Sequence, residues 1–563
     1  MIYHCEDRTC NYWDEGEKLP ERCPQCGRKL LRANEADMTG DDWTALGNTL
    51  WDAEASDKKR MVDCFRKAAY LGSAWGVCNL GICMEQGNGV EADPAQAFWL
   101  YQQAVEMGSL NAVCCLGVCY EHGIGTAPDA KQAAELYCKA AEYGSPRGQM
   151  LLARAFHDGI GVEADAAEAV HWVRAAAYQR YGEGMHRLGV CYEYGDGVEQ
   201  NWERAVHWFR EAAESGVSVA MADLGYCYEK GCGVEQSWEQ AFSWYRRGAE
   251  CGNPVSMSNL GLCYQMGYGV EQNWQEAIKW YEQGAQCGNL QSMNNLAYCY
   301  EYGEGVEQNE ERALYWYRRG AEAGSDYCMY CLGWNYSNGE GVEQNMTEAI
   351  RWYTAAAEGG NADAMHNLGW LYDHGEGVEQ DMKKAICWYE RAAEQNHPAA
   401  MNSLGECYAM GRGVPRDLET AMEWYRRAAE LGEAMADYNM GWHLEQAGKL
   451  SEAYAHYRKA ADGNDDSAWW ALGRFYENGV VVVQDGKEAR RCYETGEKLG
   501  SVKCKMRLAR CKLLGIGGRR AKKAGLDLCR QALELAKESS EKEDYGYEAE
   551  MNLLRRTIAE NES

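Results

Sequence analysis

A nearly identical stretch of sequence returns every 36 residues along this chain. Residues 189–216 read GVCYEYGDGVEQNWERAVHWFREAAESG, and residues 261–288 read GLCYQMGYGVEQNWQEAIKWYEQGAQCG. The leucine of the recurring Leu-Gly pair, or its equivalent, marks the steps of 36 at Leu80, Leu116, Leu152, Leu188, Leu224, Leu260, Leu296, Leu332, Leu368, Leu404 and Met440, with weaker copies at Leu46, Leu472 and Leu508. We call this residue the anchor. A fixed period of this kind predicts one long repeat domain rather than several independent globular cores.

Each repeat is predicted to form two helices. In residues 253–267, apolar or small side chains at positions 257, 260, 261 and 264 follow the spacing of one helical stripe. Asn253 before Pro254 is a helix start signal, and the glycine-containing loop that follows ends the helix. The second helix begins at a residue that is nearly always Asn, Ser or Asp. Three positions after that cap, Gln240, Glu276 and Glu348 are predicted to complete capping boxes.

A helix pair of this kind cannot bury its apolar faces alone, but stacked copies bury them against each other. We therefore expect an all-α fold, a right-handed α/α superhelical solenoid of about 13–14 two-helix repeats. The hydrophobic fraction of 46 % is enough for such a core.

The chain of 563 residues is strongly acidic, with a formal net charge of −29. Such a charge repels nucleic acid and anionic membranes, and it attracts basic partners. No apolar run is long enough for a transmembrane helix, and the first residues lack the apolar core of a secretory signal. We therefore expect a cytoplasmic protein with no nucleic-acid or membrane partner.

The repeat carries a family resemblance. Its pattern A-x-x-x-L-G-x-x-Y-x-x-G-x-G-V-x-x-[ND]-x-x-x-A-x-x-W-Y-x-x-A-A-x-x-G resembles the Sel-one-like repeat, a relative of the tetratricopeptide repeat. Good copies run from about residue 73 to 433, and degenerate copies extend to about 40 and 530. The resemblance implies an α/α solenoid that serves as an adaptor or scaffold for protein assemblies.

The first thirty residues stand outside the repeat and contain two pairs of cysteines. Cys5 and Cys10 form one pair, and Cys23 and Cys26 form a second pair in the sequence CPQCG. Four thiolates from two short turns suit a structural, tetrahedral Zn²⁺. The alternative is a redox-active or unpaired set of thiols in a flexible tail. The expected domains are therefore a zinc-ribbon-like segment (1–35), the solenoid (36–540) and a C-terminal capping helix or tail (541–563).

Cysteines also recur inside the repeats. Eight of them follow an anchor by three residues: Cys83, Cys119, Cys191, Cys227, Cys263, Cys299, Cys407 and Cys511. Because they share one position on the first helix, we interpret them as small buried hydrophobes. No second cysteine recurs at a fixed partner position, so regular disulfides are not expected.

Motifs of catalysis are missing from the sequence. It contains no phosphate-binding loop, no G-x-S-x-G and no H-E-x-x-H, and its histidines are scattered. We therefore expect a non-catalytic scaffold that binds a protein or peptide and no small-molecule substrate. The alternative is a hydrolase, β-lactamase-like or zinc-dependent, that uses the solenoid to bind its substrate.

The resemblance to tetratricopeptide repeats implies that the first helices line the concave side. Residues five and two positions before the anchor, and two and five after it, would then face a groove. The predicted groove residues are Tyr298, Glu301, Tyr327, Tyr330, Trp334, Trp370, Asp373 and Trp442. Aromatic rings flanked by carboxylates suit a basic, partly apolar peptide segment. The alternative is that the rings pack between neighbouring repeats.

The N-terminal segment yields the first testable prediction. Elemental analysis of the purified chain should find about one zinc per molecule, because a segment this small needs metal binding for its folding free energy. Replacing Cys23 and Cys26 by Ser should release the metal. A metal-free protein whose N-terminal segment is ordered would contradict the prediction.

Overall fold

The computed structural model describes residues 2–5, 13–15, 30–32, 35–51, 55–542 and 547–562. At the N-terminal end, three short strands form an antiparallel sheet in the order β2-β1-β3. The strands are β1 (Ile2–Cys5), β2 (Trp13–Glu15) and β3 (Leu30–Arg32). Cys5 ends β1, whereas Cys10, Cys23 and Cys26 lie outside the described residues. The zinc site therefore stays a prediction.

The chain divides into two compact units, residues 1–292 and 293–563. After a short 3-10 helix, η2 (Glu35–Asp37), the helices of the first unit are α1 (Gly40–Thr49), α2 (Ala55–Tyr70), α3 (Ala74–Gln86), α4 (Pro94–Glu106), α5 (Leu110–His122), α6 (Ala130–Glu142), α7 (Pro146–Asp158), α8 (Ala166–Tyr178), α9 (Gly182–Tyr194), α10 (Trp202–Glu214), α11 (Ser218–Lys230), α12 (Trp238–Glu250), α13 (Pro254–Met266) and α14 (Trp274–Gln286).

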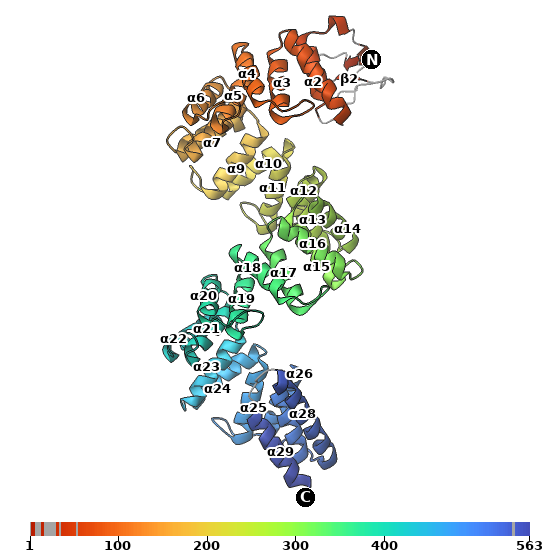
Figure 1. The fold of residues 1–563 in the computed structure, drawn as a ribbon. Coiled ribbons are helices and arrows are strands. Elements are labelled where there is room, and N and C mark those ends of the chain that lie inside the picture. Colours follow the sequence, from red (N-terminus) through yellow and green to blue (C-terminus); the bar gives the residue numbers. More distant parts are fainter. Residues whose placement is uncertain are drawn as a thin grey trace. The chain divides into compact units, whose positions relative to one another are not determined.

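The second unit continues the same pattern of helices. It contains most of α15 (Leu290–Tyr302), then α16 (Glu310–Glu322), α17 (Asp326–Asn338), α18 (Met346–Glu358), α19 (Ala362–His374), α20 (Met382–Glu394), α21 (Pro398–Met410), α22 (Leu418–Glu430), α23 (Ala434–Gln446), α24 (Leu450–Asp462), α25 (Asp466–Asn478), α26 (Gly486–Lys498), α27 (Val502–Leu514), α28 (Lys522–Lys542) and α29 (Glu548–Glu562). Consecutive helices pack in pairs, from α1 with α2 to α27 with α28 (Figure 1). Fourteen such pairs among the described residues confirm the predicted all-α repeat architecture.

Polar caps begin and end the helices as the sequence predicts. The Asn253 side chain accepts a hydrogen bond from the Ser256 backbone amide at 2.7 Å, and Asn273 does the same for Glu276 at 3.2 Å. Gly267 ends α13 in the left-handed conformation, with φ of 75°. The capping boxes are incomplete, however. The Glu276 carboxylate lies 3.2 Å from the Lys279 amine on the exposed side of α14.

The repeated glutamine of the V-E-Q loop has a structural role that the sequence analysis missed. The Gln272 side-chain amide donates to the backbone carbonyl of Gln265 at 2.7 Å, and Gln308 donates to Glu301 at 2.9 Å. These carbonyls belong to the last turn of a first helix, where no intrahelical donor is available. The loop residue therefore satisfies a backbone acceptor that would otherwise need water.

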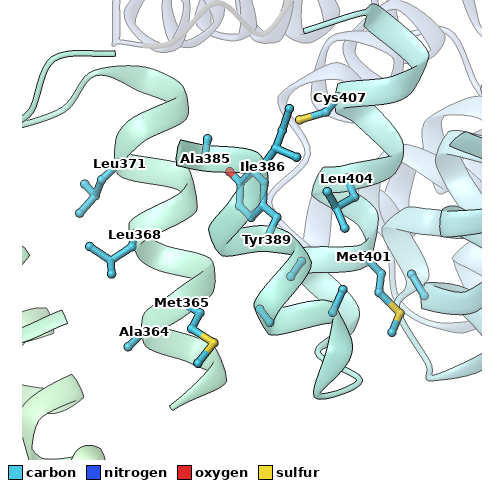
Figure 2. Packing of buried hydrophobic residues seen from close by; sticks show 14 of the residues in the cluster. Ala364, Met365, Leu368, Leu371, Ala385, Ile386, Tyr389, Met401, Leu404 and Cys407 are labelled. Atoms are coloured by element: carbon cyan, nitrogen blue, oxygen red, sulfur yellow. The ribbon is translucent and has the colours of Figure 1, made fainter. Parts of the chain in front are cut away.

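A tyrosine from the second helix fills the centre of each typical repeat. Tyr281 is fully buried, and a Cβ atom added at Gly261 would lie 2.5 Å from the Tyr281 ring. Glycine at this position leaves room for the ring to lie close against the first helix. Figure 2 shows the equivalent Tyr389 of α20 between α19 and α21. We call this packing the tyrosine–glycine contact.

The tyrosine hydroxyl has its own acceptor at the end of the first helix. In each case the acceptor is the residue five positions after the anchor, and the O–O distances are 2.5–2.8 Å for Tyr101–Glu85, Tyr137–Glu121, Tyr245–Glu229, Tyr281–Gln265, Tyr317–Glu301, Tyr457–Glu445 and Tyr493–Glu477. A buried hydroxyl without an acceptor would be costly. Where the residue at this position is acidic and bonded to the tyrosine, it is thus part of the fold of the repeat.

The first helices of neighbouring repeats contact one another directly. Examples are α3 with α5, α5 with α7 and α11 with α13 in the first unit, and α25 with α27 in the second. The layer whose helices approach most closely lies on the inner side of a curved stack. The first helices therefore form the inner layer of each unit, which is where the predicted groove residues lie.

The eight cysteines three residues after an anchor are all buried free thiols, as predicted. Burial raises the pKa of Cys263 to about 12 and that of Cys83 to about 11, so these thiols stay protonated near neutral pH. They fill space between helices and are not reactive groups. None of the helices in the described part of the chain is long and apolar enough to cross a membrane.

Helix α29 packs against α27 and α28 at the C-terminal end of the second unit. The Arg507 guanidinium donates two hydrogen bonds to the Glu550 carboxylate, at 2.6 and 2.7 Å, and also lies 3.3 Å from Glu477. Arg510 pairs with Glu477 as well. Arg507 and Arg510 of α27 therefore form an internal ionic network that holds the terminal helix.

Candidate binding surface on the first helices

Five of the predicted groove aromatics lie on the surface of first helices in the second unit. Tyr298 is on α15, Tyr327 and Trp334 are on α17, Trp370 is on α19, and Trp442 is on α23. Their exposed fractions are 37–46 %, so none of these rings is part of the core between repeats. Tyr330 is half-buried, with its ring centroid 6.0 Å from that of Tyr353, and it contributes to packing. We call the five exposed rings the aromatic stripe.

Two further aromatic side chains extend the aromatic stripe. Tyr302 packs against Tyr298 with 4.6 Å between ring centroids, and His374 stacks on Trp370 at 4.3 Å. Both lie one turn after the predicted residue on the same helix. The sequence analysis missed them because it considered only four positions per repeat, although the i, i+4 spacing was available as a signal.

The two predicted groove carboxylates are engaged inside the chain. Glu301 accepts the hydrogen bond of Tyr317 at 2.7 Å, and burial raises its pKa. Asp373 is only 4 % exposed and pairs with the Arg412 guanidinium at 2.9 Å. The sequence analysis placed both in the groove as free acids, but their position also serves the fold of the repeat.

A small acidic cavity of about 240 Å³ lies beside the aromatic stripe. Its lining includes Glu301, Glu310 and Glu340, together with Tyr302 and Asn335. Asn335 is 4 % exposed, and its side-chain oxygen is buried without a hydrogen-bond partner. A buried acceptor without a donor is costly, so Asn335 is a polar group that the fold itself leaves unsatisfied. Among the described residues, no group of three or more histidine, cysteine and acidic side chains is arranged so that it could hold a metal ion.

Stacked helix pairs with an exposed inner layer define the class of α/α repeat proteins. The sequence profile of the Sel1 repeat matches twelve segments: 76–109, 112–145, 146–181, 182–217, 218–253, 254–289, 290–325, 326–361, 362–397, 398–433, 434–465 and 468–501. The chain therefore belongs to the Sel1 repeat family. The pairs α1–α2 and α27–α28 lie outside these segments, and they are the degenerate copies that the sequence predicts at Leu46 and Leu508.

Solved structures similar to this chain include other repeat proteins of this family. A protective antigen of uropathogenic Escherichia coli strains, with an SLR fold, is 29 % identical over 76 % of this chain and 94 % of its own, with a TM-score of 0.55. A Sel1 repeat protein from Oxalobacter formigenes is 28 % identical over 58 % of this chain and 92 % of its own, with a TM-score of 0.43. The comparison with curated proteins gives no match.

The hydrogen bond between Tyr317 and Glu301 leads to a stability prediction. Replacing Tyr317 by Phe should lower the free energy of local unfolding of the α15–α16 pair by about 1–2 kcal/mol, because a half-buried carboxylate loses its donor. Tyr425 is an equally buried control, since Ala409 stands where the acceptor would be. Native-state hydrogen exchange should show almost no change for Tyr425→Phe. Equal effects of the two substitutions would contradict the role assigned to the hydroxyl.

Proposed function

We propose that this chain is a non-catalytic scaffold, and that the inner layer of its second unit binds a basic, partly apolar segment of a partner protein. Membership of the Sel1 repeat family supports the scaffold role, because a repeat stack offers an extended surface for partners. The observation that carries the proposal is the acidic cavity next to the aromatic stripe.

The lining of the cavity favours a lysine or arginine side chain. Glu301, Glu310 and Glu340 supply negative charge, and the buried oxygen of Asn335 needs a donor. Lysine carries three N–H donors and arginine carries five. Neither side chain has an acceptor of its own. A basic side chain would therefore supply a donor for the Asn335 oxygen and balance the negative charge of the three glutamates.

The aromatic stripe continues directly from this cavity. Tyr302 lines the cavity and packs against Tyr298, while Trp334 precedes Asn335 on α17. Apolar residues of the partner would lie on these rings, and further basic residues would lie over their faces as cation–π pairs. Large aromatic residues commonly supply most of the binding free energy in such interfaces.

The proposal is tested with the full chain and a set of fluorescent synthetic peptides in which leucine alternates with Lys, Glu or Gln. Fluorescence anisotropy should show saturable binding of the Lys peptide at physiological salt and none of the Glu peptide. The double variant Trp334→Ala with Trp370→Ala should weaken binding by about 30-fold, equivalent to about 2 kcal/mol. Glu340→Gln should weaken it less and should reduce its dependence on salt.

Tyr315→Ala is the matched control, because this ring is 51 % exposed but lies on α16, a second helix of the same unit. It should leave binding unchanged. The proposal fails if the folded double variant binds the Lys peptide as the parent does, or if Tyr315→Ala weakens binding equally.

A further inference from the structure

One repeat of the first unit departs from the tyrosine–glycine contact. In the pair α7–α8, Val173 stands where the other repeats of the first unit have a tyrosine or phenylalanine, and Ala153 stands where they have glycine. The acceptor position at the end of α7 is His157 instead of an acidic residue. In the α19–α20 pair, by contrast, the equivalent space is filled by Tyr389 (Figure 2). The missing ring and the missing acceptor occur in the same repeat.

A partly enclosed cavity of about 470 Å³ lies at this place, bounded by α7, α8 and α9. The apolar lining includes Val170, Val173 and Ala153, each 3 % exposed, together with Met150 and Leu151. The volume falls within the range of small-molecule sites in proteins, which are apolar with a few polar groups placed for orientation.

Three arginines also line the cavity: Arg147, Arg154 and Arg187. Arg147 and Arg154 occupy inner-layer positions, five before and two after the anchor, that are not basic in the neighbouring repeats. The repeat before has Asn111 and Val118 there, and the repeat after has Glu183 and Val190. Positive charge on the inner layer is thus concentrated in the repeat that lacks the tyrosine.

Two of these arginines are paired within the chain. Arg154 lies 2.5 Å from the Glu121 carboxylate, and Arg187 lies 3.9 Å from Asp196. Arg147 is half-buried and has no carboxylate of the described residues within 4 Å. Its guanidinium makes only long contacts, at 3.5 Å to the Asn111 side-chain oxygen and 3.6 Å to the Cys115 sulfur.

The acidic side chains that line the cavity are engaged elsewhere. His157 lies between Asp158 at 2.5 Å and Asp196 at 3.2 Å, and Glu183 accepts a hydrogen bond from the Tyr181 hydroxyl at 3.2 Å. Arg147 is therefore the arginine in the lining that has no carboxylate partner among the described residues. Its neighbour is the Cys115 thiol, whose pKa is lowered by a hydrogen bond with Cys78 and by Arg147 itself. A half-buried guanidinium in this state favours an anionic ligand.

We propose that this cavity binds a small aromatic carboxylate. Its ring takes the space that the tyrosine ring fills in other repeats, against Val170, Val173 and Ala153. Its carboxylate accepts hydrogen bonds from the Arg147 guanidinium, whose planar fork matches carboxylate geometry. The site is in the first unit and does not rest on the peptide surface of the second unit. It departs from the sequence expectation that no small molecule is bound.

The test is isothermal titration calorimetry of the full chain with 3-phenylpropanoate as the probe. The expected dissociation constant is below about 1 mM, and the neutral isostere 3-phenylpropanamide should bind at least about tenfold more weakly, because it lacks the charge that Arg147 recognises. Acetate, which has the charge without the ring, should bind no more tightly than the amide.

Two variants separate the two halves of the site. Ala153→Gly with Val173→Tyr restores the pattern of the other repeats, so the protein should stay folded, with a thermal midpoint no lower than the parent, and should lose binding. Arg147→Gln keeps the cavity. It should lower the affinity for 3-phenylpropanoate by about tenfold or more without changing the affinity for the amide. Arg246→Gln, at an exposed arginine of α12, is the control that should bind as the parent does.

Several outcomes would overturn the proposal. One is the absence of a heat of binding at a probe concentration 10-fold above the expected dissociation constant. The others are equal affinity for the carboxylate and the amide, and full binding by the cavity-filled variant. If the cavity-filled variant does not fold, Arg147→Gln decides alone, and unchanged affinity for 3-phenylpropanoate would exclude the site.

Discussion

The fold of this chain depends on one contact that is made inside most of the repeats. A tyrosine from the second helix lies against a glycine on the first, as Tyr281 does on Gly261, and its hydroxyl bonds to the end of that first helix. The contact fixes the distance and angle between the two helices of a pair. Because the same residues recur at the same spacing, the pairs stack with the same geometry, and the first helices form an inner layer with exposed side chains.

The sequence alone predicted most of this architecture. The 36-residue period, the caps such as Asn253 and Asn273, and the burial of the cysteines after the anchors follow from local signals that repeat. It did not predict that the acidic residue in the last turn of the first helix is a partner of the buried tyrosine. Periodicity shows that a residue recurs, but it does not show whether the cause is the fold or a ligand. The sequence analysis therefore assigned Glu301 and Asp373 to the groove, because the sequence does not show which residues of the chain they bond to.

Binding sites in such a stack are expected where the common contacts change. In the second unit the surface of the first helices becomes aromatic, and an acceptor at Asn335 is left unsatisfied. In the first unit the tyrosine is replaced by Val173, and an unpaired Arg147 lies beside the resulting cavity. The two proposed sites differ in charge and size, so the two proposals assign two kinds of ligand to one scaffold. Identity between repeats maintains the stack, and differences between them provide selectivity.

Native-state hydrogen exchange of the unliganded full chain tests the central claim that the tyrosine–glycine contact stabilises each pair. The pair α7–α8, which lacks the tyrosine, should open at a lower free energy than the pairs α5–α6 and α9–α10 on either side, by about 1–3 kcal/mol for the missing buried ring. All three pairs lie inside the first unit, so fraying at a chain end does not complicate the comparison. Equal protection of the three pairs, or greater protection of α7–α8, would contradict the account.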